Sequence, residues 1–257
     1  MCRTFNFFVF TFAFLGFAAT ADAQLRVPAA TQGPRWRTTI GINGGIQPTT
    51  GNESQTFKVQ KNLEDAPVTT SLSPGTAQLI DIGVGLMPAR GRLGVNVNVA
   101  LTSRQFGGNV SAQIPHPFFF NTLRPVSGSV SSLPESGLAV HIGAAYQIWT
   151  STRFDLTGSA GPSFFRVTQD VVTDVTYTET YPYDTATFAS APSTRTTASA
   201  WGVNAGADLT WKLSRRLGVG ALVRYAHGSV TLTPSAGNDV SANVGGLQLG
   251  GGLRLLY

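Results

Sequence analysis

The chain has 257 residues, which suits one domain of ordinary to large size, and it carries a formal net charge of +5. Charged residues make up only 12% of the chain, and Lys and Arg form no dense run, which argues against a nucleic-acid-binding protein. The single cysteine, Cys2, lies in a predicted export signal, which excludes a disulfide-held domain, a thiolate metal site and a cysteine nucleophile.

The first 23 residues predict a cleaved secretory signal peptide. Arg3 supplies a short positive region, residues 4–17 are almost wholly apolar, and Ala21-Asp22-Ala23 has the small-x-small form of a cleavage site. A short N-terminal segment, residues 24–34, is expected to follow. Residues 35–257 are then expected to form the folded domain.

Eight segments of this domain alternate between apolar and small or polar residues, which predicts β-strands with one apolar face. They are residues 35–47, 77–87, 93–102, 138–149, 153–167, 200–213, 217–226 and 247–257. Short turns at residues 88–92, 150–152 and 214–216 alternate with loops of roughly 15 to 35 residues, as in outer-membrane barrels. The sequence therefore predicts an all-β, eight-stranded antiparallel up-and-down transmembrane β-barrel with both termini at the short-turn, periplasmic rim.

Charged side chains support this prediction because they fall opposite the apolar face. A lipid-facing Arg or Lys near the middle of a bilayer costs roughly 2–4 kcal/mol. We expect a structural polar network in the lumen, with Asp208 close to Arg224 and Asp155 near Lys212. Its predicted members are Arg37, Asp81, His141, Asp155, Asp208, Lys212, Arg224 and Arg254. Arg166 breaks the pattern, and a bulge after Gly161-Pro162 would explain it.

Aromatic residues lie near the predicted strand ends, as the girdles of a membrane barrel do. Trp36, Trp149, Phe154, Trp211 and Tyr257 fall toward the short-turn rim, and Phe164, Trp201 and Tyr225 fall toward the loop rim.

Three stretches carry a resemblance to the small OmpA/OmpX-like outer-membrane β-barrel family: residues 158–165, 202–208 and 250–257. The last stretch is similar to the C-terminal signature read by the barrel assembly machinery. Gly252, Leu255 and Tyr257 match that signature, whereas Gly250 stands at its polar position. The resemblance implies an eight-stranded barrel in a bacterial outer membrane, exported through the periplasm, without a peptidoglycan-binding domain. It does not imply a particular activity.

Two further activities stay open as alternatives. Glycines on the lumen face would leave room for water, which allows a narrow ion or small-solute channel; they are Gly41, Gly83, Gly85, Gly143, Gly206, Gly218, Gly220 and Gly252. His227 and Ser229 resemble the His-x-Ser of lipid A deacylase barrels, in which His activates Ser. Val230 replaces the Asn that follows in that pattern, and Asp239 is the nearby acid.

The predicted loops hold the other candidate sites. Residues 167–194 contain Asp170, Asp174, Glu179 and Asp184, which would form either a solvated acidic surface or a weak cation site. Residues 114–120 include three consecutive phenylalanines, an apolar stretch suited to contact with the barrel mouth, lipid or a partner. The turns contain Arg90, Arg92, Arg153, Arg215 and Arg216, which are either solvated or attracted to anionic headgroups.

The sequence thus favours a non-enzymatic outer-membrane barrel that serves envelope structure, surface recognition or adhesion. A narrow channel is the alternative function, and a lipid A deacylase-like hydrolase is a remote one. No cofactor or metal is expected. The expected partners are outer-membrane lipids and lipopolysaccharide, the barrel assembly machinery and an unidentified extracellular ligand.

Overall fold

A computed structural model describes residues 36–49, 52–233 and 240–257. The predicted signal peptide, residues 1–23, and the segment 24–34 lie outside the described residues. The chain divides into two units, Met1–Gly33 and Pro34–Tyr257, and the described residues all belong to the second. Among them, no helix is long and apolar enough to span a membrane.

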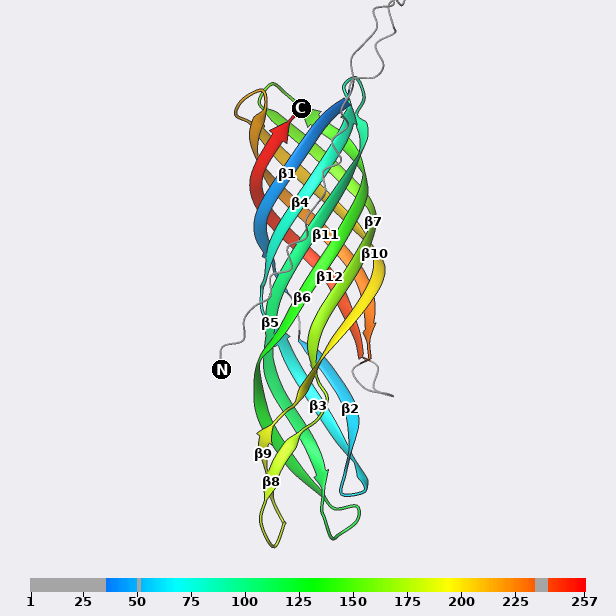
Figure 1. The fold of residues 1–257 in the computed structure, drawn as a ribbon, viewed down its shortest axis with the longest axis vertical. Coiled ribbons are helices and arrows are strands. Elements are labelled where there is room, and N and C mark those ends of the chain that lie inside the picture. The colour runs from blue at the N-terminus through cyan, green and yellow to red at the C-terminus, as the bar shows by residue number, and fades with distance from the viewer. Residues whose placement is uncertain (1–35, 50–51, 234–239) are drawn as a thin grey trace, which may run out of the picture. The chain divides into compact units, whose positions relative to one another are not determined.

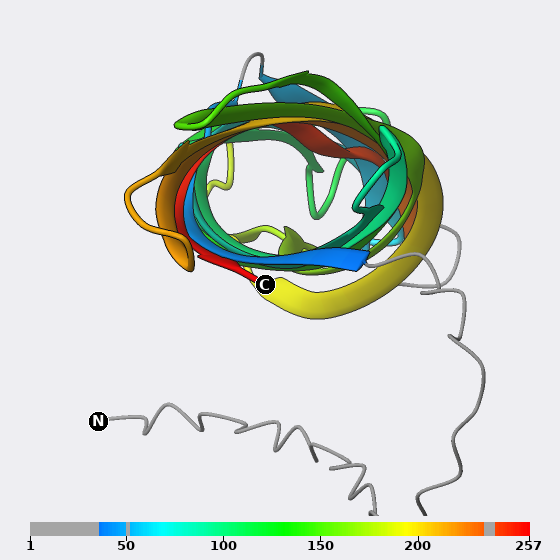
Figure 2. The same cartoon turned by 90° about the horizontal axis from the view of Figure 1, so that it is seen from above.

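Eight antiparallel strands of the second unit close into a ring (Figures 1 and 2). In chain order they are β1 (Trp36–Gln47), β4 (Ala77–Pro88), β5 (Leu93–Pro115), β6 (Leu123–Thr150), β7 (Phe154–Val172), β10 (Ser193–Lys212), β11 (Leu217–Leu232) and β12 (Val240–Leu256). The last strand pairs with the first, with Ile40 opposite Leu255, so the ring has no free edge. The predicted eight-stranded barrel is confirmed.

The segments predicted as long loops contain further strands, which the sequence analysis did not predict. The segment after β1 forms the hairpin β2 (Glu53–Lys61) and β3 (Glu64–Pro74), and β8 (Thr176–Glu179) pairs with β9 (Ala186–Ser190). β3 pairs with the distal part of β5, which stays paired with β6 as far as Pro115 opposite Leu123. The alternation of apolar and polar residues is weak in these segments, so it did not predict strands. Strand pairing nevertheless satisfies the hydrogen-bonding groups of their backbone. We call β2, β3, β8, β9 and residues 103–115 and 123–137 the hairpin extension.

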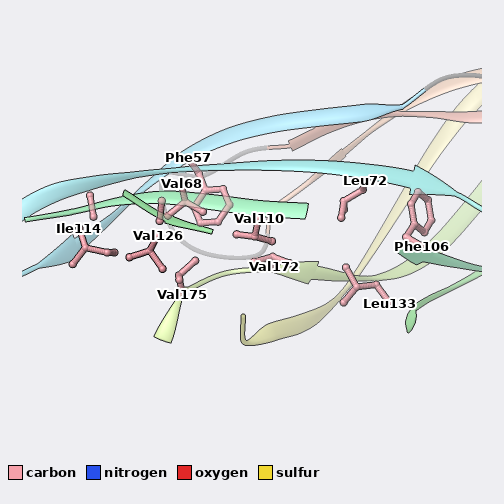
Figure 3. Packing of buried hydrophobic residues seen from close by; sticks show 12 residues of the cluster. Phe57, Val68, Leu72, Phe106, Val110, Ile114, Val126, Leu133, Val172 and Val175 are labelled. Atoms are coloured by element: carbon pink, nitrogen blue, oxygen red, sulfur yellow. The ribbon is translucent and has the colours of Figure 1, made fainter. Parts of the chain in front are cut away.

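The hairpin extension has an apolar core of its own (Figure 3). Phe57 and Val68 from the β2–β3 hairpin pack with Val110 and Val126 from β5 and β6. Val175, which follows β7, belongs to the same fully buried cluster. Because three chain segments share one core, the extension continues the barrel as a packed body rather than as separate loops.

The outer surface of the ring is apolar, and its inner surface is polar. Ile42, Ile82, Val97 and Ile142 point outward with 44–52% of their surface exposed, whereas Asp81, Gln248 and Arg254 are buried inside. This arrangement inverts the usual burial pattern, in which charged residues are almost never fully buried and large apolar patches are covered. An apolar belt on a closed ring of strands is the surface that lipid covers in a transmembrane barrel.

Arg166 lies on the outward face of β7, as its position in the alternation requires. The bulge predicted after Gly161-Pro162 is therefore wrong. Pro162 pairs with Val203 in unbroken register, and the irregularity lies in β6 between Gln147 and Trp149. Arg166 is the next outward residue beyond Phe164, whose ring meets that of Trp201 edge-on at 5.3 Å. The charge therefore lies just past the aromatic girdle, where headgroups replace hydrocarbon.

Candidate functional site

A buried polar network crosses the middle of the barrel interior. The Arg224 Nη1 atom lies 2.8 Å from Asp81 Oδ2, and these side chains are 2% and 0% exposed. The amide groups of Asn43 and Asn98 donate to the other carboxylate oxygen, at 3.0 and 3.2 Å. Asp81 thus accepts three hydrogen bonds, which offset the cost of removing its charge from water.

Asp208 pairs with Arg254 of β12 and not with Arg224, contrary to the sequence-based expectation. Arg254 Nε donates to Asp208 Oδ1 at 3.2 Å, and its Nη1 donates to Asn43 at 2.6 Å. Arg254 reaches β10 by crossing β11 at Gly220, where an added Cβ would lie 2.7 Å from the guanidinium group. The missing side chain of Gly220 therefore decides which acid Arg254 meets.

Several lumen glycines make room for polar side chains of neighbouring strands. A Cβ on Gly83 would lie 2.1 Å from the Asn98 amide, and one on Gly143 would lie 2.4 Å from Asn96 Oδ1. At these two positions, an asparagine side chain of the neighbouring strand occupies the space beside the glycine. The space belongs to the hydrogen-bonded network.

Toward the short turns, the interior opens into a cavity of about 790 Å³, which we call the turn-side cavity. Lys212 forms an ion pair of 2.7 Å with Asp155 at its wall, on the neighbouring strand. Arg37 donates to Gln147 Oε1 at 2.6 Å, while its buried Nε has no partner. Arg153 and Arg215 line the same cavity from the turns.

The interior is apolar on the side of the hairpin extension. Phe165, Val167, Leu79 and Val230 belong to a buried cluster there. His141 lies next to this cluster: its Nδ1 is 2.8 Å from Ser163 Oγ, and its ring meets Phe165 edge-on at 5.9 Å. Packed apolar side chains thus fill the interior on this side of the polar network, which favours a closed interior over a wet channel.

Another buried ion pair lies within the hairpin extension, in segments that the sequence predicted as loops. Arg104 donates to both carboxylate oxygens of Glu135, at 2.8 and 3.0 Å, and its guanidinium lies 4.8 Å from the Phe106 ring centre. Burial raises the pKa of the nearby Glu53 carboxyl; Arg104 opposes this shift, and Glu135 adds to it. Arg104 and Glu135 lie opposite each other on the paired strands β5 and β6. The sequence analysis missed this ion pair because it placed both residues in a loop, where no cross-strand partner is expected.

We expect acid to favour the fold of β2 and β3 through Glu53. Because its pKa in the folded protein is raised, the native state holds a proton over a pH range in which the unfolded chain has lost it. The contribution of Glu53 to the free energy of unfolding is therefore fully present at low pH. It is lost as the pH rises from the ordinary glutamate pKa through the raised pKa of Glu53 in the folded protein. Glu53→Gln should remove that fall, measured by the hydrogen-exchange protection of β2–β3 amides between about pH 4 and pH 7.

The control is Asp65→Asn, which removes an acid whose ion pair with Lys58 is largely exposed. Its protection should keep the pH dependence of the parent protein. A Glu53→Gln protein with an unchanged pH profile would contradict the assignment to Glu53.

The predicted assembly signature lies at the closing seam. An added Cβ on Gly252 would lie 1.8 Å from the Ile42 carbonyl oxygen, so β12 approaches β1 closely only because this residue is Gly. Leu255 pairs with Ile40 and points outward, and Tyr257 is exposed at the short-turn end.

The remaining predicted sites are dispersed. His227 and Ser229 both point outward from β11, and Asp239 lies outside the described residues. Of the acids in residues 167–194, Asp170, Asp174 and Glu179 form ion pairs with Arg195, Lys61 and Arg124. No group of three or more potential metal ligands occurs among the described residues.

Aromatic side chains gather at the far end of the hairpin extension. Phe118, Phe119 and Phe120 of the β5–β6 turn are 63–72% exposed, and Tyr181 of the β8–β9 turn is 84% exposed. Phe118 meets Tyr183 edge-on at 5.5 Å, which joins the two turns. We call these five residues the aromatic tip.

Ion pairs and hydrogen bonds between hairpins hold the aromatic tip in place. Arg124 pairs with Glu179 at 2.6 Å and also donates to the Tyr183 carbonyl oxygen at 2.8 Å. The buried His116 accepts hydrogen bonds at Nδ1 from the backbone N–H groups of Phe118 and Phe119, at 3.1 and 3.2 Å. The exposed rings are therefore carried on an ordered turn.

These features define the class of protein. A closed antiparallel ring with an apolar outer belt, aromatic residues at the strand ends and buried ion pairs inside the ring is a transmembrane β-barrel of the bacterial outer-membrane type.

No protein-family model matches the chain, and no curated protein matches it. Solved structures similar to it include the outer membrane protein OprG from Pseudomonas aeruginosa, at 9% identity and a TM-score of 0.47, covering 87% of this chain and 97% of that one. Another is Ail of Yersinia pestis in complex with the heparin analogue sucrose octasulfate, at 14% identity and a TM-score of 0.36, with coverage of 84% and 98%. The outer membrane protease OmpT from Escherichia coli matches at 11% identity and a TM-score of 0.38, with coverage of 86% and 97%.

Proposed function

We propose that this protein is a non-enzymatic outer-membrane barrel that presents the aromatic tip to a protein partner outside the cell. The observation that carries this proposal is the group of exposed rings at the end of a packed, ion-paired extension. Isolated exposed apolar side chains are ordinary, but a contiguous group on a fixed support is typical of a contact surface. Fixing the rings before contact lowers the entropy lost on binding.

The charges around the tip favour a protein over a lipid surface. Glu64 and Asp184 lie in or beside the tip turns, and the exposed Asp65 forms an ion pair with the exposed Lys58, so the charges near the tip are mixed. Segments that bind anionic membranes place Lys and Arg around their apolar residues. Aromatic residues with a mixed polar rim are instead characteristic of protein interfaces.

The barrel itself would anchor this extension in the membrane. Its lipid belt and its exposed Arg166 suit the hydrocarbon and the anionic headgroups of outer-membrane lipids and lipopolysaccharide. Gly252, Leu255 and Tyr257 remain the proposed signature for the barrel assembly machinery. The packed apolar cluster around Phe165 is the reason to rank a channel below this function.

Replacing the three phenylalanines with serine should strongly weaken partner binding without weakening the barrel. An aromatic hot spot contributes about 2 kcal/mol or more, so even one hot spot among the three lowers the affinity by at least about thirtyfold. Exposed substitutions change stability by about 0.5 kcal/mol or less. Binding of nanodisc-embedded protein is measured against an array of purified extracellular-matrix and serum proteins, with phosphatidylcholine vesicles as a separate arm.

Thr56→Ala provides the control, because Thr56 is exposed on the side of the β2–β3 hairpin. It should bind like the parent protein. The proposal fails if the parent protein binds nothing on the array, if the triple variant binds equally well, or if only the lipid vesicles are bound in a phenylalanine-dependent manner.

A further inference from the structure

The turn-side cavity contains an arginine whose charge is not balanced. The carboxylates of Asp155 and Asp208 at its wall pair with Lys212 and Arg254, and deeper in the barrel Asp81 pairs with Arg224. Within the part of the chain that the structure describes, Arg37 has no carboxylate at ion-pair distance. The side-chain carboxylates of Asp155, Asp208 and Asp81 are thus each paired with a cation other than Arg37.

The hydrogen-bond donors of Arg37 are also incompletely used. A guanidinium group carries five N–H donors, and Arg37 contributes one hydrogen bond, from Nη2 to the Gln147 side chain. Its Nε is shielded from solvent and has no acceptor. A buried donor without an acceptor is costly, so an acceptor that enters the cavity gains this unmet hydrogen bond as well as the charge interaction.

The mouth of the cavity adds positive charge. Arg153, in the turn between β6 and β7, and Arg215, in the turn between β10 and β11, both line it. Neither makes an ion pair with a described acid. Because the acids of the wall are already paired, these arginines leave the mouth of the cavity positively charged, and such a concave surface attracts anions.

We propose that the turn-side cavity is a binding site for small oxyanions, phosphate or carboxylate, held by Arg37 with Arg153 and Arg215 at the mouth. The planar guanidinium fork matches the oxygen spacing of both groups and binds them through paired, charge-assisted hydrogen bonds. A volume of about 790 Å³ is in the range of small-molecule pockets. The ligand enters from the short-turn side, so this site is independent of the aromatic tip.

The test follows the Arg Nε–H NMR signals of the barrel refolded in a maltoside detergent, which carries no phosphate. Sodium phosphate is titrated at constant ionic strength with chloride as the balancing anion. The Arg37 signal should shift and reach saturation. Because a hydrogen bond to a charged group contributes about 1.5–3 kcal/mol, phosphate should bind about tenfold more weakly to Arg37→Gln, followed through the Arg153 signal.

Arg37→Lys keeps the charge but loses the fork, and it should bind with intermediate affinity. Arg90→Gln is the matched control, because Arg90 lies in the β4–β5 turn but does not line the cavity. It should bind phosphate like the parent protein. Unchanged amide spectra in the variants establish that the barrel is folded, and a double Arg153→Gln/Arg215→Gln variant tests the mouth if Arg37→Gln does not fold.

A second arm distinguishes a free oxyanion from a lipid headgroup. In nanodiscs, phosphatidylglycerol in place of phosphatidylcholine should leave the Arg37 signal unchanged if the ligand is a free oxyanion. If phosphatidylglycerol shifts this signal and blocks the phosphate response, the site binds the headgroup of an anionic lipid. A shift that grows linearly with phosphate, or one that is equal for Arg90 and Arg37, would overturn the proposal.

Discussion

Asp81→Asn is expected to destabilise the barrel by roughly 3–5 kcal/mol, the usual cost of removing one partner from a buried ion pair. The substitution preserves the shape of the side chain and an oxygen for the Asn43 and Asn98 donors. It replaces the charged oxygen that accepts the hydrogen bond of Arg224 with an NH2 donor, so Arg224 loses both its counter-charge and its acceptor. The free energy of unfolding is measured by urea titration of the protein in lipid vesicles, with tryptophan fluorescence as the signal.

Asp155→Asn is the comparison variant, because its ion pair with Lys212 is partly open, with side-chain exposures of 17% and 23%. We expect a loss of about 1 kcal/mol or less there, as for solvent-screened pairs. Adding Arg224→Gln to Asp81→Asn should recover much of the lost stability, because no unpaired charge remains. Equal losses for the Asp81 and Asp155 variants would contradict the view that burial makes the first pair critical.

Val97→Arg should block stable insertion into bilayers. Val97 points outward from β5 and pairs with Val84 and Ile142 on the neighbouring strands, which also point outward. An arginine on the lipid face near the middle of the bilayer costs roughly 2–4 kcal/mol. The insertion yield into vesicles is measured by the heat-modifiable migration of the folded barrel in gel electrophoresis.

Asn96→Arg is the control, one residue away on the same strand. Asn96 lines the turn-side cavity, where space and polar groups can accommodate a longer side chain. Its insertion yield should stay close to that of the parent protein. If the two variants insert equally well or equally badly, the assignment of inward and outward faces on β5 is wrong.

The strand positions and the lumen face were predictable because the membrane imposes a simple rule on a closed barrel. Each lipid-facing position must be apolar, so alternation in β5 or β11 shows directly in the sequence. The same rule does not act outside the membrane. In the hairpin extension, residues 103–115 and 123–137 face water on one side and a small core on the other, and they were expected to be loops.

Ion-pair partners were harder to predict than faces. Arg224 and Asp208 lie on adjacent strands, and proximity along the sheet suggested a pair. Long side chains inside a narrow barrel cross to other strands, and Gly220 opens the way for Arg254 by leaving space for its guanidinium group. The sequence shows such glycines, but not which side chain occupies the space beside them.

The sequence by itself determined the closed antiparallel barrel, the direction of its charged residues and the order of its short turns. These follow from local alternation and from the cost of a charge in lipid, which acts on each position separately. Only the tertiary structure decided which acids and bases meet, that Arg37 is left without a carboxylate, and that three hairpins build one extension with an aromatic tip. Those outcomes depend on the register and curvature of strands far apart in the chain, where contact is set by the closure of the whole ring.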